Sequence, residues 1–193
     1  MGCIFFFCVG IGLVTWMILF TYRIILGRGL EEGEYDLEDH RVKAWKTNYL
    51  LKLYIMQLIH HSPFVYWDVF ILLSFRNKVA TNVRINKCFY DPEFIDIAAN
   101  TECAAFSIIH THQIKEGKLH IKRTKIGKNV IIGGFAHVGA GVTIGDNTIV
   151  GLGCYVPDDM VLEPNSLYIG NPARKLPKSV LKKEYDQKKR KVD

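Results

Sequence analysis

Hydrophobic and polar positions alternate with a fixed period of six between residues 126 and 168. An aliphatic or aromatic anchor stands at every sixth position of this stretch. A glycine follows most anchors, and a small or medium side chain lies two positions before most of them. The anchors are Ile126, Ile132, Val138, Ile144, Val150, Val156, Leu162 and Tyr168.

This period predicts a parallel β-helix. Side chains two apart in a strand share a face, so each anchor and the residue two before it should fill an interior. The glycine or Asp-Asn after the anchor should permit the bend at each corner. Three six-residue units close one triangular coil, and successive coils stack. We therefore expect an all-β domain of about five coils over residues 78–174.

The same pattern starts earlier in the chain and is interrupted once. Position 91 carries Asp91-Pro92 in place of an aliphatic anchor, and Ile126 follows Ile109 by seventeen positions, which is two steps of six plus five. This spacing predicts one strand hidden at 120–125 and one loop excursion over 110–119. The earlier anchors are Val79, Ile85, Ile97, Cys103 and Ile109.

With that register, the residues just before the anchors fall on three outer faces. Only one of these faces is uniformly apolar, and an exposed apolar stripe of this size predicts a covering partner. Contact between subunits would cover it, as would the helices that precede the coil. The predicted apolar face holds Tyr90, Ile108, Ile131, Ile149 and Leu167.

The N-terminal segment is long and apolar. Residues Ile4–Leu26 contain one charged residue, Arg23, and are long enough to cross a bilayer as a helix. A cleaved signal peptide is the alternative, although no Lys or Arg precedes the apolar run. We predict a single-pass membrane anchor over residues 1–28. Arg23 and Arg28 place the following β-helix domain on the cytoplasmic side by the positive-inside rule.

An acidic linker over residues 29–43 precedes two predicted helices within residues 44–77. Ala44–His60 is apolar on most sides, and Phe64–Phe75 is an apolar run too short to span a membrane. These membrane-proximal helices either lie at the membrane or cap the first coil. A basic, helical tail is expected over residues 175–193.

Composition adds limits to this picture. The chain has 193 residues, is 49% hydrophobic and carries a formal net charge of +6, with much of the excess in the basic tail. No recognition motif accompanies the charge, so we expect no nucleic-acid partner. The cysteines have no paired metal-binding spacing, and Cys103 and Cys154 occupy inward positions typical of reduced core thiols.

Three segments resemble the hexapeptide-repeat acyltransferases, including galactoside and maltose O-acetyltransferases. They are Ile126-Gly-Lys-Asn-Val-Ile-Ile-Gly-Gly, Val138-Gly-Ala-Gly-Val-Thr-Ile-Gly-Asp-Asn and Tyr168-Ile-Gly-Asn-Pro-Ala-Arg. Ser62-Pro63 and the excursion Thr111-His112-Gln113 also resemble membrane-linked β-helix domains of nonribosomal-peptide-synthetase-like proteins. The resemblance implies a left-handed coil, a homotrimer and acyl transfer from acetyl-coenzyme A to a hydroxyl or amine of a small molecule or glycan.

In the family a histidine on a loop that leaves the coil acts as general base, and His112 stands at the matching position. A histidine pKa near neutrality suits this role. His110 is the second candidate, and Glu116 is a candidate to orient the base.

The family also binds coenzyme A between subunits, and the matching positions near the last coils are Gly151, Gly153, Asn171, Arg174 and Lys175. An arginine can bind phosphate in bidentate fashion. This chain departs from the family at Pro157-Asp158-Asp159, where many members have Thr-Lys-Asp, so a basic partner of the cofactor is missing.

Two alternatives of other classes stay open. The first is a zinc enzyme similar to γ-class carbonic anhydrases, with His110, His112 and His137 as ligands and a fourth position for water. No histidine stands five positions from His137, as the known ligand spacing requires, and we expect no metal. The second is a scaffold without catalysis that assembles a membrane-bound trimer through its apolar face.

Overall fold

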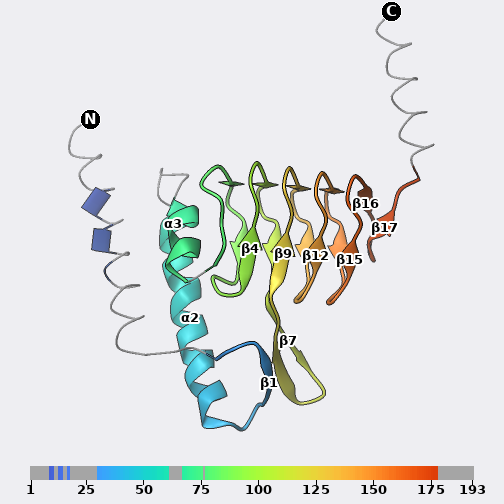
Figure 1. The fold of residues 1–193 in the computed structure, drawn as a ribbon. Coiled ribbons are helices and arrows are strands. Elements are labelled where there is room, and N and C mark those ends of the chain that lie inside the picture. Colours follow the sequence, from blue (N-terminus) through green and yellow to red (C-terminus); the bar gives the residue numbers. More distant parts are fainter. Residues whose placement is uncertain are drawn as a thin grey trace, which may run out of the picture.

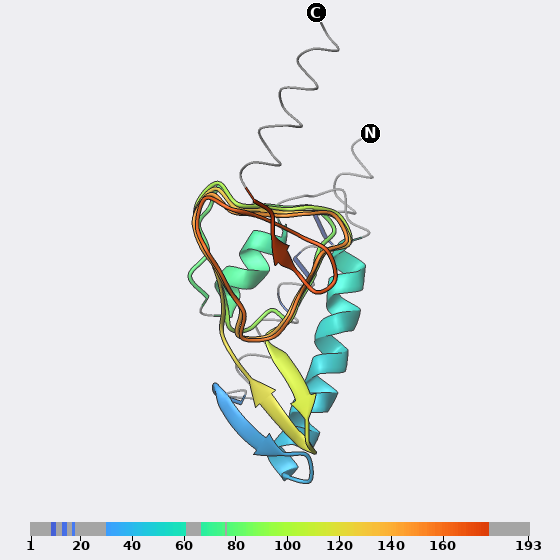
Figure 2. The ribbon, with the colours of Figure 1, turned by 90° about the vertical axis from the view of Figure 1, so that its right-hand side faces the viewer.

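The computed structural model describes residues 9–10, 13–14, 17, 30–60, 67–75 and 77–177. Short parallel strands wind into coils that stack in a row (Figure 1). Viewed along the row, successive coils superimpose on one rounded triangle (Figure 2). The predicted all-β domain of stacked parallel strands is therefore confirmed.

Three sheets form the sides of the prism, and we name them in the order in which the chain visits them. Sheet I has the order β17-β16-β13-β10-β5-β2, sheet II the order β14-β11-β6-β3 and sheet III the order β15-β12-β9-β4. Sheet I contains β2 (Arg84–Ile85), β5 (Glu102–Cys103), β10 (Ile131–Ile132), β13 (Ile149–Val150), β16 (Leu167–Ile169) and the antiparallel β17 (Arg174–Lys175). Sheet II contains β3 (Phe89–Tyr90), β6 (Ile108–Ile109), β11 (His137–Val138) and β14 (Tyr155–Val156). Sheet III contains β4 (Ile95–Ile97), β9 (Thr124–Ile126), β12 (Thr143–Ile144) and β15 (Val161–Leu162).

The anchors fill the interior of the prism. All of them from Ile126 to Tyr168 are buried, together with small residues two positions earlier such as Val130, Ala136 and Val142. The free thiols of Cys103 and Cys154 lie in the same core, as predicted. One anchor differs from the prediction, because Tyr90 and not position 91 points inward and pairs with Ile109.

Two features of the corner residues allow the coils to stack closely. A Cβ atom on Gly133 would lie 2.7 Å from the Gly151 carbonyl carbon, so the glycine after the anchor provides clearance from the next coil. The left-handed backbone needed for the bend occurs later in the corner, at residues such as Asn129, with φ of 53°. Asparagine tolerates this conformation. Side-chain amides then bond from coil to coil, from Asn82 to Asn100 at 2.6 Å, Asn100 to Asn129 at 3.1 Å, Asn129 to Asn147 at 2.9 Å and Asn147 to Asn165 at 3.1 Å.

The excursion is a β-hairpin that leaves the corner between sheets II and III. Its strands are β7 (His112–Lys115) and β8 (Lys118–Ile121), joined by Glu116 and Gly117 with φ of 52° and 74°. Positive φ at both residues suits a two-residue hairpin turn. The predicted hidden strand at 120–125 is therefore wrong. The chain passes from β6 of sheet II through the hairpin to β9 of sheet III.

Because the chain passes from sheet II to sheet III through the hairpin, the residues that share an outer face differ from the prediction. Ile131, Ile149 and Leu167 share sheet I, but they continue from Arg84 and Glu102. Ile108 lies instead on sheet II, paired with His137. The prediction that five apolar residues share one face is therefore wrong. It aligned the first coils with the later ones by counting the hidden strand, and that strand does not exist at residues 120–125.

The predicted linker is partly structured. β1 (Gly33–Asp36) joins the hairpin antiparallel to β8, giving the sheet order β1-β8-β7. Glu34 of β1 pairs with His120 of β8 at 3.2 Å, and Glu32 before β1 pairs with Arg123 just after β8 at 2.8 Å. The N-terminal strand thus fixes the hairpin from one edge.

Two helices follow β1. Helix α2 (His40–His60) begins earlier than the predicted Ala44, because Asp39 accepts a 2.8 Å hydrogen bond from the Arg41 amide and caps the helix. Its Val42 and Trp45 pack on Leu119 and Ile121 of the hairpin.

Helix α3 (Trp67–Ser74) lies at the N-terminal end of the coil stack (Figure 1). Its Val69 and Leu72 belong to the same core cluster as Val79 and Val83 of the first coil. The helical segment was predicted either to lie at the membrane or to cap the first coil. Helix α3 caps the first coil.

The predicted membrane anchor falls largely outside the described residues, as does the tail beyond residue 177. Within the described part of the chain, no helix combines the length and apolar character required to cross a membrane. The anchor over residues 1–28 stays a prediction.

Replacing Leu72 by alanine should lower the free energy of unfolding by about 2–5 kcal/mol, because its fully buried side chain closes the open end of the core. Leu73→Ala is the matched control, since Leu73 is 40% exposed on the same helix. Denaturant unfolding of the full chain measures both changes. Equal losses for the two variants would contradict the assignment of α3 as a cap.

Candidate active site

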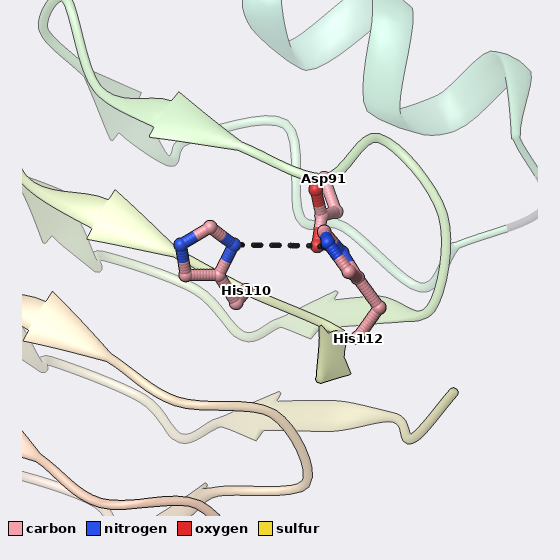
Figure 3. Close-up of side chains that lie close together, drawn as sticks. All are labelled: Asp91, His110 and His112. Atoms are coloured by element: carbon pink, nitrogen blue, oxygen red, sulfur yellow. Dashed lines mark hydrogen bonds and ion pairs between the residues drawn. The ribbon is translucent and has the colours of Figure 1, made fainter. Parts of the chain in front are cut away.

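A cluster of polar residues lies at the corner between sheets II and III. Asp91 follows β3, and His110 follows β6 in the next coil. Tyr90 pairs with Ile109, so these two corner residues stack on each other, and the Asp91 amide donates to the Ile109 carbonyl at 3.1 Å. His112 is the first residue of the hairpin. Adjacent coils and the start of the excursion thus bring all three residues together (Figure 3).

One oxygen of Asp91 receives most of the contacts in this cluster. Its Oδ2 lies 2.6 Å from Nδ1 of His112 and 3.7 Å from Nδ1 of His110 (Figure 3). The same oxygen accepts hydrogen bonds from the Thr111 amide at 2.7 Å and from the Thr111 hydroxyl at 3.3 Å. One carboxylate oxygen therefore holds both Thr111 and His112, and both imidazoles turn Nδ1 toward it.

The charge on Asp91 is stable despite its burial. Burial favours the protonated acid, but hydrogen bonds from His110, His112 and the Thr111 amide outweigh this effect and hold the pKa of Asp91 well below its usual range. The hydrogen bond to Asp91 raises the pKa of His110, against the opposing effect of burial. An ionised carboxylate facing two histidines is thus the resting state of the cluster at neutral pH.

Helix α2 covers the His112 ring. Trp45 and Tyr49 stack on each other with ring centroids 5.2 Å apart, and each meets His112 edge-on at 5.0 Å. A small pocket opens beside His112, lined by Trp45, Tyr49, Asp91, Pro92, Glu93, Phe94, Thr111, His112 and Ile121. Trp45, Pro92, Phe94 and Ile121 give it an apolar wall, and its polar groups belong to Tyr49, Asp91, Glu93, Thr111 and His112.

The aromatic contacts continue from His110 along sheet II. The His110 ring lies 4.9 Å from that of His137, which meets Tyr155 edge-on at 5.2 Å. Burial lowers the pKa of His137, and the charge of His110 lowers it further. His137 is therefore neutral at physiological pH, on the outer face beside the candidate site.

The three histidines of the zinc alternative do not form one group within the described residues. The metal-ligand atoms that lie within 4.8 Å of one another belong to Asp91, His110 and His112, without His137. Thr111 and His112 already bond to Asp91 Oδ2 at 2.6–2.7 Å. A cation there would have to displace these donors, so the arrangement fits an oriented pair of histidines better than a metal site.

The predicted coenzyme A residues lie elsewhere on the prism. Gly151 and Gly153 follow β13 at the corner between sheets I and II, and Gly153 has φ of 62°. Asn171, Arg174 and Lys175 lie exposed at the end of the last coil, where Lys175 pairs with Glu163. A single chain therefore does not bring these residues to the histidine corner.

Sequence reasoning missed Asp91, Trp45 and Tyr49. Glu116, the residue predicted to orient His112, lies at the hairpin turn and is exposed, and Asp91 makes the contact instead. The break in the six-residue pattern at Asp91-Pro92 was the available signal. Nothing in the spacing pointed to Trp45 or Tyr49, because a separate helix brings them to the site.

Comparison with known proteins agrees with the repeat and the fold. A family model described as "Bacterial transferase hexapeptide (six repeats)" matches residues 123–158. The protein is thus a β-helix protein that carries the hexapeptide repeat of bacterial transferases. The predicted resemblance to hexapeptide-repeat acyltransferases is confirmed.

Two curated relatives share parts of the chain. The galactoside O-acetyltransferase of Escherichia coli (strain K12) is 38% identical over 66 residues, which are 34% of this chain and 32% of that protein. The Delta-poly-L-ornithine synthetase of Acinetobacter baumannii (strain AB307-0294) is 28% identical over 101 residues, 52% of this chain and 8% of that protein. The chain thus spans about a third or less of the length of these relatives.

Solved structures of acetyltransferases share the fold. A maltose O-acetyltransferase from Clostridium difficile 630 gives a TM-score of 0.53 at 23% identity, covering 75% of this chain and 91% of that chain. A hexapeptide-repeat acetyltransferase from Vibrio cholerae O1 biovar eltor, complexed with acetyl-coenzyme A, gives 0.50 at 17% identity, covering 79% and 96%. At these identities the likeness concerns the fold alone.

Proposed function

We propose that the protein is an acyltransferase that moves an acyl group from a coenzyme A thioester to a hydroxyl or amine, with His112 as general base. The observation that carries this proposal is the 2.6 Å contact between His112 Nδ1 and the Asp91 carboxylate. A carboxylate that accepts from Nδ1 fixes the proton on that nitrogen and leaves Nε2 as the basic one. The hexapeptide repeat of bacterial transferases around residues 123–158 supports the same class of reaction.

The proposed reaction balances with one base. His112 Nε2 takes the proton from the acceptor as its oxygen or nitrogen attacks the thioester carbonyl. The new C–O or C–N bond forms, the C–S bond breaks, and the proton returns from His112 to the departing thiolate. Asp91 stabilises the imidazolium that exists between these two transfers.

His110 is less suited to the role of base. Its Nδ1 lies 3.7 Å from Asp91, compared with 2.6 Å for His112. We therefore assign His110 a supporting position beside the base.

Acetyl-coenzyme A is the proposed donor, and a small molecule or glycan is the proposed acceptor. The galactoside O-acetyltransferase and the maltose O-acetyltransferase are named for sugar acceptors, and the similar Vibrio cholerae acetyltransferase was solved with acetyl-coenzyme A. Gly151, Gly153, Asn171, Arg174 and Lys175 are the proposed contacts for the coenzyme. The missing basic residue at Pro157-Asp158-Asp159 should weaken this binding.

His112→Ala should slow thiol release from acetyl-coenzyme A, in the presence of an active acceptor, by about 10² to 10⁴ because general-base assistance is lost. His110→Ala should have a milder effect. Asp91 keeps its hydrogen bonds from Thr111 in either variant, so circular dichroism should show the fold retained in both.

His120→Ala is the matched control for this experiment, since His120 lies on the same hairpin but pairs with Glu34. Its rate should stay near that of the native protein. A collapse of the rate in His110→Ala with a loss below about tenfold in His112→Ala would reverse the two roles. If neither change affects an active native protein, the base lies elsewhere.

We further propose a homotrimer whose subunits meet over sheet I and the corner between sheets I and II. Ile131, Ile149 and Ile169 are each more than 40% exposed on sheet I, and Leu152 is 79% exposed at the corner. Phe106 and Phe135, also exposed at that corner, stack at 5.4 Å with φ of 60° and 55°. Bulky residues are costly in this conformation, and an uncovered apolar patch of this kind is unusual on a monomer.

Replacing Ile131 and Ile149 together by glutamate should dissociate the trimer, because the new charges would be buried between subunits. The matched control replaces Thr143 and Val161 by glutamate on sheet III, where Val161 is 67% exposed. Light scattering in detergent measures the mass of each protein. A monomeric native protein would contradict the trimer, and an unchanged mass in the sheet I variant would contradict this interface.

The membrane anchor over residues 1–28 completes the proposal, with the β-helix domain on the cytoplasmic side. If residues 4–26 span the bilayer, the full-length protein should stay in the membrane fraction after carbonate and high-salt washing, because the transfer of this apolar stretch outweighs peripheral charge contacts. Deletion of residues 1–28 should release it. Equal release of both proteins would contradict the anchor.

A further inference from the structure

The pocket beside His112 is very small. Its free volume is about 10 Å³, close to the least that holds one water molecule. A sugar ring or a nucleotide is many times larger, so neither can enter it. The largest ligand group that fits is about the size of a methyl group. The His112 side chain, which lines the pocket, is only 16% exposed, so a group placed there lies directly against the proposed base.

The chemistry of the pocket favours an apolar group. Four residues form its apolar wall: Trp45, Pro92, Phe94 and Ile121. On its polar side, Asp91 already accepts hydrogen bonds from Thr111 and His112. Contact with the apolar wall is favourable for a group whose surface thereby leaves water. In acyl transfer from an acetyl thioester, the methyl group is such a group, and it is bonded to the carbonyl carbon that the deprotonated acceptor attacks.

Phe94 closes the pocket in a fixed conformation. Its φ of 61° is costly for a bulky side chain, so the surrounding structure has to retain it. The ring packs against the cluster that contains Trp45 and Ile121. In addition, the guanidinium carbon of Arg123 lies 5.4 Å from the ring centroid, a distance at which a cation attracts the face of an aromatic ring.

Arg123 is in turn held by two acids. Its Nε donates to Glu32 at 2.8 Å, and its Nη1 donates to Asp96 at 2.9 Å. Glu32 precedes β1 and Asp96 belongs to β4, so the guanidinium group cannot move away from Phe94 without breaking an ion pair. The Phe94 wall therefore resists displacement by a larger ligand group.

We propose that this pocket binds the methyl group of an acetyl thioester and that Phe94 limits the acyl group to that size. The inference rests on the acyl transfer proposed above and adds the residue that selects the donor. Propionyl and butyryl groups carry further carbons, which would have to displace Phe94 or stay outside the pocket. One methylene more than a hydrophobic pocket holds typically changes specificity by about 10- to 200-fold.

Phe94→Ala tests this role, because it removes the ring that limits the pocket. Isothermal titration calorimetry of the full-length protein with acetyl- and butyryl-coenzyme A measures the preference without an acceptor. The native protein should bind acetyl-coenzyme A at least about tenfold more tightly than butyryl-coenzyme A. Phe94→Ala should bring this ratio close to one, and Phe94→Leu, which keeps part of the bulk, should give an intermediate ratio.

Ile114→Ala is the matched control, since Ile114 is 58% exposed on the same hairpin and does not line the pocket. It should keep the native ratio. A general loosening of the site would weaken the binding of both thioesters together and leave the ratio unchanged.

Equal affinities of the native protein for the two thioesters would overturn the proposal. A native ratio retained in Phe94→Leu, shown by circular dichroism to be folded, would also overturn it, even if Phe94→Ala does not fold. In both cases coenzyme A thioesters still bind, so the proposed function would stand. Binding of neither thioester to the native protein would contradict the proposed function itself, and the proposed pocket with it.

Discussion

The close stacking of coils is the constraint on which the rest of this structure depends. Each corner residue after an anchor bonds to the backbone of the neighbouring coil, as the Gly133 amide does with the Val150 carbonyl at 2.8 Å. Strands in a sheet lie about 4.8 Å apart, which leaves no room for a side chain directed between coils at that position. Glycine therefore follows five of the eight anchors from Ile126 to Tyr168, and the asparagine amides bond along the corner between sheets III and I.

The candidate site arises at a corner where polar side chains follow the inward positions of the first coils. In sheet II the residues that follow the inward positions are Asp91, His110, Gly139 and Pro157 in successive coils. The first two carry polar side chains where a later coil has glycine. The chain leaves the coil after His110 to form the hairpin, so the next strand of the coil does not follow these side chains immediately. The interruption of the coil thus leaves room for polar side chains at this corner.

A buried carboxylate explains why the surrounding elements fit together as they do. An unpaired charge at this position would cost several kcal/mol in desolvation. Asp91 avoids that cost through donors from residues 110–112. These donors belong to the coil and the hairpin, so the carboxylate joins two elements that the prism alone would leave independent, while α2 packs its Trp45 and Tyr49 rings against His112.

The sequence was informative wherever a local rule governed the structure. The interior of the coils followed from the period of six, because each anchor is buried by its own strand regardless of what precedes it. The face assignment failed because it required the number of strands within a seventeen-residue gap, and spacing alone does not distinguish a strand of the coil from a strand of a hairpin. His112 was predicted through family resemblance, whereas its partner Asp91 was visible only as an irregularity in the pattern. Trp45 and Tyr49 reach the site through tertiary packing, for which a single sequence carries no period.

The distribution of candidate residues over the prism links the proposed reaction to the proposed assembly. His112 and Asp91 lie at the corner between sheets II and III, whereas Gly151 and Gly153 lie at the corner between sheets I and II. Sheet II separates these corners within one chain, so the proposed coenzyme residues and the proposed base do not form one site within a single subunit. In a closed ring of three, an interface along the apolar sheet I patch would bring the glycine corner of one subunit toward a neighbour. Both proposals thus depend on one geometric condition, which is that the histidine corner of each subunit faces the glycine corner of the next.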